Sequence, residues 1–371
     1  MKGLDFLVCP LWVYFVEEMI KMHMADALIS PVVGGTMWAA TAGVAAYSMK
    51  KIQDDMDEKK IPLMGVMGAF VFAAQMINFS IPGTGSSGHL GGGMLLAILL
   101  GPYAGFLTMA SILVIQALFF ADGGLLALGC NVFNLGFFTC FIAYPLIYKR
   151  IMGKGYSPKR IFGAAMLSAI IGLQLGAFGV VLETLFSGKT ELPFGTFVML
   201  MQPIHLAIGV VEGLITTAIV TFVWKARPEI IEKAALGEAL GSISIKKVLA
   251  GFAIAAVIAG GVFSWFASTN PDGLEWSMFK TAGKEELEAT DGIHQKLSEI
   301  QSKTAFLPDY SFKTPENEKE QSAGEGEESW PAVNSGTSIS GLVGGGMTLA
   351  LAAFTGMTIS MIKRRKKKVI V

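Results

Sequence analysis

Histidines are the side chains in this 371-residue sequence best suited to bind a transition metal, and only four occur: His23, His89, His205 and His294. His23 follows Met22 directly, and His89 lies in a run of glycine and serine at 81–93. If Met22 is the first residue of the functional chain, its amine, the backbone nitrogen of His23 and the His23 ring can close small chelate rings around one ion. His89 can then supply a fourth nitrogen, and its glycine neighbours allow the backbone to approach closely.

Four nitrogens in a plane suit Ni(II) or Cu(II) and are compatible with Co(II), whereas Mg²⁺ and Ca²⁺ prefer oxygen ligands. We therefore predict a metal site formed by Met22, His23 and His89. On spacing alone, two unlinked histidines are a weak signal for a metal and are more often structural hydrogen-bonding residues. The three cysteines, Cys9, Cys130 and Cys140, do not have the spacing of a metal site, and we interpret them as packing residues.

The first 21 residues decide whether that site can form. They begin like a signal peptide, with Lys2 and an apolar stretch at 6–16, but Glu17, Glu18 and Lys21 replace the small residues of a cleavage site. The apolar stretch is also too short to span a membrane. We interpret 1–21 as a mis-assigned start or a leader, or else as an interfacial segment. If it stays attached, Met22 has no free amine and one ligand is lost.

Composition places the elements around these residues in a membrane. Only 16% of residues are charged, against 52% hydrophobic, and 29 basic and 29 acidic residues cancel, which gives no reason to expect a nucleic-acid partner. Most of the apolar runs are long enough to cross a bilayer as helices. The runs lie at 31–49, 61–79, 89–100, 103–121, 125–148, 161–186, 199–224, 247–267 and 338–362.

Basic residues then predict the direction of each crossing. They cluster at 50–60, 149–160, 225–227, 246–247 and 363–368, and the positive-inside rule places all of these in the cytoplasm. The number of crossings between clusters is even only if 89–100 and 103–121 count separately. We predict an all-α polytopic membrane protein with a seven-crossing helical bundle at 22–226. A cytoplasmic linker at 227–246 and a two-helix hairpin at 247–371 follow, with a large external loop at 268–337 and the C-terminus inside.

Several polar residues in or near these crossings are secondary candidates. His205 and Glu212 are seven residues apart on one helix face and act either near the site or as an interhelical polar pair. Asp122 and Asn131 flank the external end of the predicted crossing at 125–148 and are placed to orient a site histidine, although Asp122 also begins a turn. We expect His294, in the charged external loop, to face water.

Four motifs give the sequence a family resemblance. MHMADALISP begins at Met22, and NFSIPGTGSSGHLGGGMLLAILLGPYAGF, QALFFADGGLLALGCNVFNLG and HLAIGVVEGLIT follow in order. Over 22–226 the chain resembles the substrate-specific membrane component of energy-coupling-factor transporters for cobalt and nickel. The segment PDGLE at 271–275, after a helix, resembles the small companion subunit of these systems, so the whole is similar to the fused, nickel-type arrangement.

The resemblance implies a site and partners. In the family the metal is held by the N-terminal amine, the backbone and ring nitrogens of the second-residue histidine and a histidine of the glycine-rich loop, which here are Met22, His23 and His89. It implies a multi-pass protein of the cell membrane, in contact with lipid and without enzymatic activity or a prosthetic group. Such a protein carries Ni²⁺, favoured by the fusion, or Co²⁺. Two cytoplasmic ATPase subunits and a transmembrane coupling (T) component are the implied partners.

Two other functions fit parts of the pattern. In an intramembrane serine protease, Ser87 within Gly85-Ser86-Ser87-Gly88 is the nucleophile and His205 the base. In a haem-binding membrane protein, His89 and His205 are the axial ligands. A serine protease would leave the two-helix PDGLE segment unexplained, and a haem protein would show strong visible absorption on purification.

Overall fold

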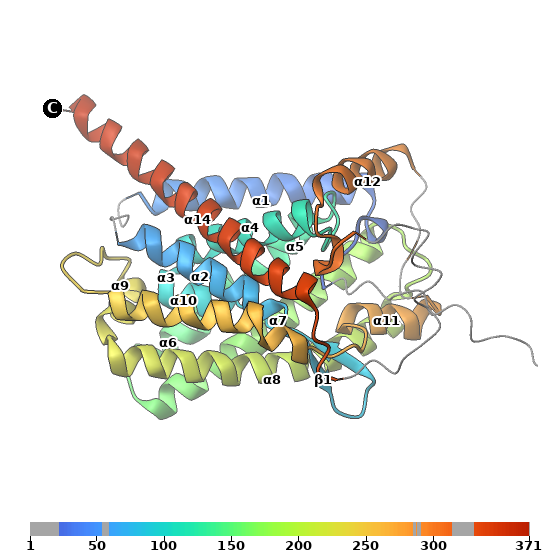
Figure 1. The fold of residues 1–371 in the computed structure, drawn as a ribbon, viewed down its shortest axis with the longest axis horizontal. Coiled ribbons are helices and arrows are strands. Elements are labelled where there is room, and N and C mark those ends of the chain that lie inside the picture. The colour runs from blue at the N-terminus through green and yellow to red at the C-terminus, as the bar shows by residue number, and fades with distance from the viewer. Residues whose placement is uncertain (1–21, 54–58, 285–286, 288–290, 314–329, 371) are drawn as a thin grey trace, which may run out of the picture.

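The computed structural model describes residues 22–53, 59–284, 287, 291–313 and 330–370, and it is a bundle of helices with one small β-hairpin (Figure 1). The predicted extension at 1–21 lies outside the described residues. Five of the described helices are long and apolar enough to cross a membrane. They span Pro102–Phe119, Leu128–Met152, Pro158–Phe186, Phe194–Ala226 and Ser335–Arg365. The prediction of an all-α polytopic membrane protein is therefore confirmed.

The first part of the chain contains the helices that surround the candidate site. They are α1 (Pro31–Lys51), α2 (Lys60–Gln75), α3 (Gly93–Leu100), α4 (Pro102–Phe119), the continuous run α5 (Leu128–Val132), η2 (Phe133–Tyr148) and α6 (Lys149–Met152), then α7 (Pro158–Phe186) and α8 (Phe194–Ala226). Local sequence explains where several begin. Ser30 and Ser157 cap α1 and α7, because each side chain accepts a backbone hydrogen bond and a proline takes the first helical position.

The predicted crossing at 89–100 is only partly helical. Its helix α3 has eight residues, all buried, and the residues before it at 89–92 have no regular secondary structure. Gly101, with φ of +82°, turns the chain directly into α4 beside the backbone of Ala234. Because glycine tolerates this positive φ and has no Cβ atom, α3 and α4 can form a tight hairpin whose turn touches the linker helix α9 (Pro228–Leu236).

The C-terminal part packs on the first part mainly through α2. Its elements are α10 (Lys246–Gly261), η3 (Phe263–Phe266), α11 (Gly273–Ala282), α12 (Gly292–Thr304), η4 (Pro308–Tyr310) and α14 (Ser335–Ile370). Both α10 and α14 contact α2 and each other, with further contacts of α14 with α4 and of α11 with α8. A Cβ atom at Gly341 would lie 2.5 Å from the carbonyl oxygen of Gly260, so glycine at this crossing lets the two backbones touch.

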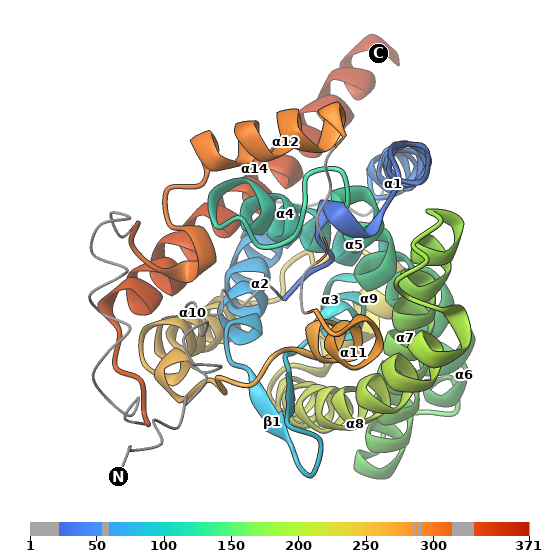
Figure 2. The ribbon, with the colours of Figure 1, turned by 90° about the vertical axis from the view of Figure 1, so that its right-hand side faces the viewer.

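The ends of the bundle differ. The hairpin β1 (Phe79–Ile81) and β2 (Ser86–Gly88), paired with Phe79 opposite Gly88, lies at one end together with α11 and α12, and α9 lies at the opposite end (Figure 1). This grouping is the one that the charge pattern predicts. Seen from the hairpin end, α11 lies across the middle of the bundle (Figure 2). The segment at 268–337 therefore contributes folded elements to this face and is more than a connecting loop.

Candidate metal centre

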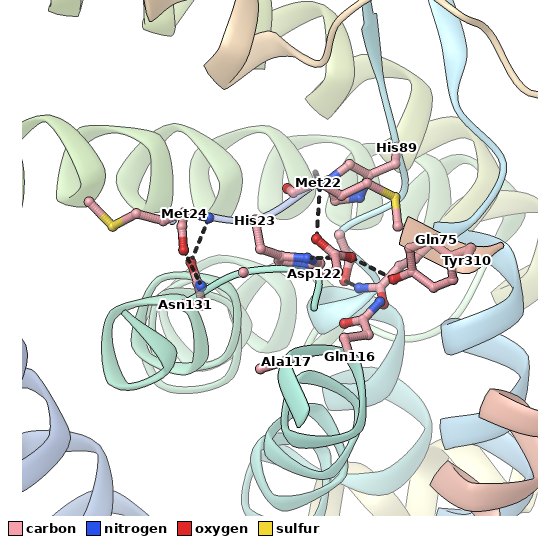
Figure 3. Close-up of polar contacts among 12 residues, drawn as sticks. Met22, His23, Met24, Gln75, His89, Gln116, Ala117, Asp122, Asn131 and Tyr310 are labelled. Carbon is pink, nitrogen blue, oxygen red and sulfur yellow. Dashed lines mark hydrogen bonds and ion pairs between the residues drawn. The ribbon is translucent and has the colours of Figure 1, made fainter. Parts of the chain in front are cut away.

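The structure brings the three predicted ligands together at the hairpin end. The rings of His23 and His89 are 5.4 Å apart between centroids and tilted by 53°. The His89 Nε2 atom lies 3.1 Å from the carbonyl oxygen of Met22 (Figure 3). Met22 and His23 are both buried, with 5% of each residue exposed. Two segments far apart in the sequence, the one before α1 and the one after the hairpin, therefore meet at one point.

Asp122 holds two of the nitrogens that the predicted chelate needs. The Met22 backbone nitrogen donates to Asp122 Oδ1 at 2.9 Å, and His23 Nδ1 lies 3.0 Å from Asp122 Oδ2. The predicted role of Asp122 in orienting a site histidine agrees with this geometry. Burial acts to raise the pKa of the Asp122 carboxyl, but the His23 ring and the hydroxyl of Tyr310 outweigh it and hold that pKa below its usual value. The group at the centre of this cluster is therefore a carboxylate.

Asn131 fixes the backbone on the other side of His23. Its side-chain oxygen accepts from the Met24 nitrogen at 3.1 Å, and its amide nitrogen donates to the Met24 carbonyl at 3.1 Å. Asp26 continues this contact, because its carboxylate accepts from the Ala127 nitrogen at 2.9 Å. The segment that carries His23 is thus attached to the start of α5 by side chains that match its backbone donors and acceptors.

Glu212 fixes the loop that carries His89. Its two carboxylate oxygens accept from the nitrogens of Gly91 and Gly92 at 2.8 and 3.1 Å, at the N-terminus of α3. Gln75 donates to the Gly91 carbonyl at 3.0 Å. Of the two roles considered for Glu212, a role near the site and a polar pair with His205, this geometry agrees with the first. His205 has a separate contact, because its Nδ1 lies 2.8 Å from the Met201 carbonyl one turn earlier in the same helix.

The C-terminal part contacts the hairpin through the residues just before α11. The Ser87 nitrogen donates to the Pro271 carbonyl at 2.7 Å, and the Ser87 hydroxyl donates to the Asn270 carbonyl at 2.8 Å. Asp272 then caps α11 by accepting from two backbone nitrogens of that helix. Because the Ser87 hydroxyl hydrogen points to a carbonyl and the His205 ring to its own helix, the geometry does not support a serine protease.

His294 occupies an unexpected position. The expectation that it faces water is wrong, because 5% of the residue is exposed and its Nε2 lies 2.9 Å from the Asp26 carbonyl and 3.0 Å from that of Ile29. Its Nδ1 lies 2.7 Å from the carboxylate of Asp291, which also caps α12. Gln301, seven residues later, donates to the Gly123 carbonyl at 2.7 Å. His294 and Gln301 are seven residues apart and therefore lie on one face of α12, and this spacing was the sequence signal that could have indicated their shared contact with the rest of the protein.

A small cavity of about 80 Å³ lies beside the predicted ligands. His23, His89, Asn131, His205 and Asp272 are among the residues that line it. A cavity of this size has room for a few waters and suits a small ion. The haem alternative finds no support, because the Nδ1 atom of His205 lies 2.8 Å from the Met201 carbonyl of its own helix and His89 Nε2 lies 3.1 Å from the Met22 carbonyl.

Side chains alone do not form the site. Among residues in the described ranges, no group of three or more histidine, cysteine or carboxylate side chains is arranged to hold a metal. The predicted set depends instead on the amine and backbone nitrogens of Met22 and His23, which such a grouping of side chains does not include. Both cysteines in the described part of the chain, Cys130 and Cys140, are buried and free, as predicted for packing residues.

Comparison with known families divides the chain into two matches. Residues 23–230 match the family described as cobalt uptake substrate-specific transmembrane region. Residues 246–361 match the PDGLE domain.

Individual relatives carry related names. A putative metal transport protein of Haloquadratum walsbyi is 35% identical over 57% of this chain and 93% of its own length. A putative fused nickel transport protein of Archaeoglobus fulgidus is 37% identical over 64% of this chain and 76% of its own. A crystal structure of a truncated transition metal transporter is 30% identical, covers 55% of this chain and 99% of its own, and has a TM-score of 0.49.

Proposed function

We propose, because the chain belongs to the cobalt uptake substrate-specific transmembrane family, that it is the ion-capturing membrane component of an importer for Ni²⁺ or Co²⁺. Transport of cobalt or nickel by a membrane component follows from the family itself. The observation that carries the proposal further is the convergence of Met22, His23 and His89 on one buried point beside a cavity. Transition metals bind nitrogen ligands of this kind.

The proposed ligands are the Met22 amine, the backbone and ring nitrogens of His23 and the ring of His89. Support comes from Asp122, since one carboxylate contacts both the Met22 nitrogen and His23 Nδ1. Two atoms that one carboxylate can hold are close enough to converge on one ion. This ligand set requires a free amine at Met22. We therefore propose that the mature chain begins at Met22 and lacks residues 1–21.

Nickel is the proposed cargo, with cobalt as the alternative. The relative from Archaeoglobus fulgidus and another from Rhodobacter capsulatus, which is 31% identical, are both named as fused nickel transport proteins. A fused arrangement matches the PDGLE domain at 246–361 of this chain. The nitrogen ligands suit either ion, so the preference rests on this arrangement.

Transport against a gradient needs an energy source. We propose that two cytoplasmic ATPase subunits and a transmembrane coupling component supply it, and that the hairpin end faces outside with the C-terminus inside. The basic clusters support this orientation, because positive residues favour the cytoplasmic side. We also propose the division into the binding component at 22–226, the linker at 227–246 and the small-subunit part at 247–371.

The test combines intact mass with metal binding. We expect protein isolated from its native membrane to have the mass of a chain that begins at Met22. His23→Ala and His89→Ala should each abolish Ni²⁺ and Co²⁺ binding by the purified protein and uptake by cells. His205→Gln is the matched control, because His205 lines the same cavity but is not a proposed ligand, and it should keep most binding. Full binding by both alanine variants would disprove the site.

A further inference from the structure

Tyr310, from the C-terminal part, reaches the carboxylate at the centre of the site. Its hydroxyl donates to Asp122 Oδ2 at 2.5 Å, the same oxygen that lies 3.0 Å from His23 Nδ1. We propose that Tyr310 is a positioning residue for metal capture and acts through Asp122. When His23 Nδ1 leaves Asp122 Oδ2 to bind the ion, the Tyr310 hydroxyl remains as the hydrogen-bond donor to that oxygen. The inference rests on the proposed function, because it assumes that His23 is a ligand.

The surroundings hold the Tyr310 ring firmly. It stacks on Phe120 with 5.1 Å between ring centroids and an angle of 18° between the ring planes. The nitrogens of Leu307 and Asp309 donate to the carbonyls of Phe119 and Phe120 at 3.3 and 2.8 Å. This attaches η4 to the end of α4, directly before Asp122.

The backbone of η4 shows that this position is enforced. Asp309 and Tyr310 have φ angles of +51° and +59°, in the left-handed region that non-glycine residues seldom adopt. Such conformations persist where the surrounding structure determines them, and they concentrate at functional sites. Here the stacking on Phe120 and the backbone contacts with α4 hold the two residues in this conformation. As a result, the Tyr310 hydroxyl points at one oxygen of Asp122.

The need for a donor follows from the geometry of the chelate. A chelate ring that starts at the His23 backbone nitrogen closes through Cα, Cβ and Cγ to Nδ1, because Nε2 lies too far around the ring. Binding therefore takes Nδ1 away from Asp122 Oδ2. The Asp122 side chain is fully buried, so without Tyr310 this oxygen would be left without a partner. A buried, unpaired acceptor is costly, and the cost would fall on the metal-bound state alone.

Tyr310 also adjoins the segment that carries His89. The side-chain amide of Gln116 lies beside its hydroxyl and donates to Gln75 at 3.1 Å. Gln75 in turn donates to the carbonyl of Gly91 at 3.0 Å. A line of polar groups thus runs from Tyr310 to the loop after His89 (Figure 3). The C-terminal part contributes its hydroxyl at the junction of the two ligand-bearing segments.

The test replaces only the hydroxyl. In full-length protein purified in detergent, Tyr310→Phe keeps the stacked ring, and Tyr148→Phe is the matched control. The Tyr148 hydroxyl is also buried but has no hydrogen-bond partner among the described residues. Nickel chloride is titrated against a competing chelator, and the ligand-field absorption of bound Ni²⁺ and the thermal unfolding midpoint without metal are recorded. The same Tyr310→Phe change is also made on an Asp122→Ala background.

We expect Tyr310→Phe to weaken Ni²⁺ binding about tenfold with an unchanged absorption spectrum and an unfolding midpoint close to that of the wild type. Tyr148→Phe should bind like the wild type, and Tyr310→Phe should add no loss once Asp122 is alanine. Unchanged affinity in Tyr310→Phe, or an equal loss on the Asp122→Ala background, overturns the inference. If the wild type itself binds no nickel, the proposed function fails first and the inference fails with it.

Discussion

The two segments that carry the proposed ligands are held by different chemistry. The His23 segment is fixed by side chains, because Asp122 and Asn131 accept from its backbone nitrogens. The hairpin before His89 is fixed mainly through backbone groups of the C-terminal part, the carbonyls of Asn270 and Pro271. After His89 the chain is held by side chains of α8 and α2, because Glu212 accepts from two glycine nitrogens and Gln75 donates to the Gly91 carbonyl.

The difference teaches how each ligand can be disturbed. A backbone-to-backbone contact fixes where the hairpin lies and tolerates most substitutions, whereas a side-chain contact can be removed by one. On the His23 side the removable groups touch the ligand residue or its neighbour, so their loss changes ligand orientation. On the His89 side we single out Glu212, the side chain that holds two backbone nitrogens, because its loss leaves the nitrogens of both Gly91 and Gly92 without their acceptor. We therefore expect the larger effect there.

Glu212→Gln should give the largest loss. The carboxamide offers one oxygen to two backbone donors, and its NH₂ group would face the second donor, so one of Gly91 and Gly92 loses its partner in a buried place. We expect Ni²⁺ affinity to fall by up to about a hundredfold, the upper end for residues that support metal ligands. Isothermal titration or chelator competition on the purified protein measures it.

Glu183→Gln is the control for that change. Glu183 is also a buried carboxylate, but it accepts from the side chain of Asn134 and not from the loop that carries His89. It should lower thermal stability by a similar amount while leaving nickel affinity within about threefold of the wild type. Equal losses of affinity in the two variants would mean that Glu212 serves general stability and not the position of His89.

Asn131→Ala tests the His23 side. The change removes both hydrogen bonds to the Met24 backbone, and 1% of Met24 is exposed, so water cannot replace them. Each unpaired group costs about 1–3 kcal/mol, and we expect affinity to fall about tenfold because Asp122 still accepts from the Met22 nitrogen. Asn134→Ala, one turn further along the helix, should leave affinity unchanged. A larger effect than that of Glu212→Gln would reverse the comparison.

The sequence alone predicts the helices and the proposed ligands, but it does not predict contacts between segments that are far apart in the chain. Long apolar runs predict the helices, since burial in a membrane needs little tertiary information, and chelate geometry singles out Met22, His23 and His89. Tyr310 was not singled out and His294 was wrongly expected to face water, because their partners are a distant carboxylate and distant carbonyls. Glu212 was noticed, yet its partners are backbone nitrogens, which no pattern of side chains displays. The run at 89–100 is recognisably short in the sequence, but its periodicity does not show that only Gly93–Leu100 is helical.

The smallest effect concerns pH and again separates the two segments. Burial acts to lower the pKa of His294, but Asp291 and the carbonyls of Ile29 and Asp26 outweigh it and raise that pKa above its ordinary value. A raised pKa in the folded state contributes stability below the unfolded value of about 6.5, and that contribution is lost as pH rises through the folded pKa.

We therefore expect the His23 segment to loosen as pH rises from about 6.5, the unfolded value, through the raised pKa of His294 in the folded state. Amide hydrogen exchange, corrected for the intrinsic rate at each pH, should show falling protection at Asp26–Leu28 and constant protection at Phe79–Gly88. The hairpin should not respond, because its contacts with Asn270 and Pro271 contain no titrating group. His294→Gln should abolish the pH dependence at Asp26–Leu28, and an unchanged slope in that variant would assign it to another group.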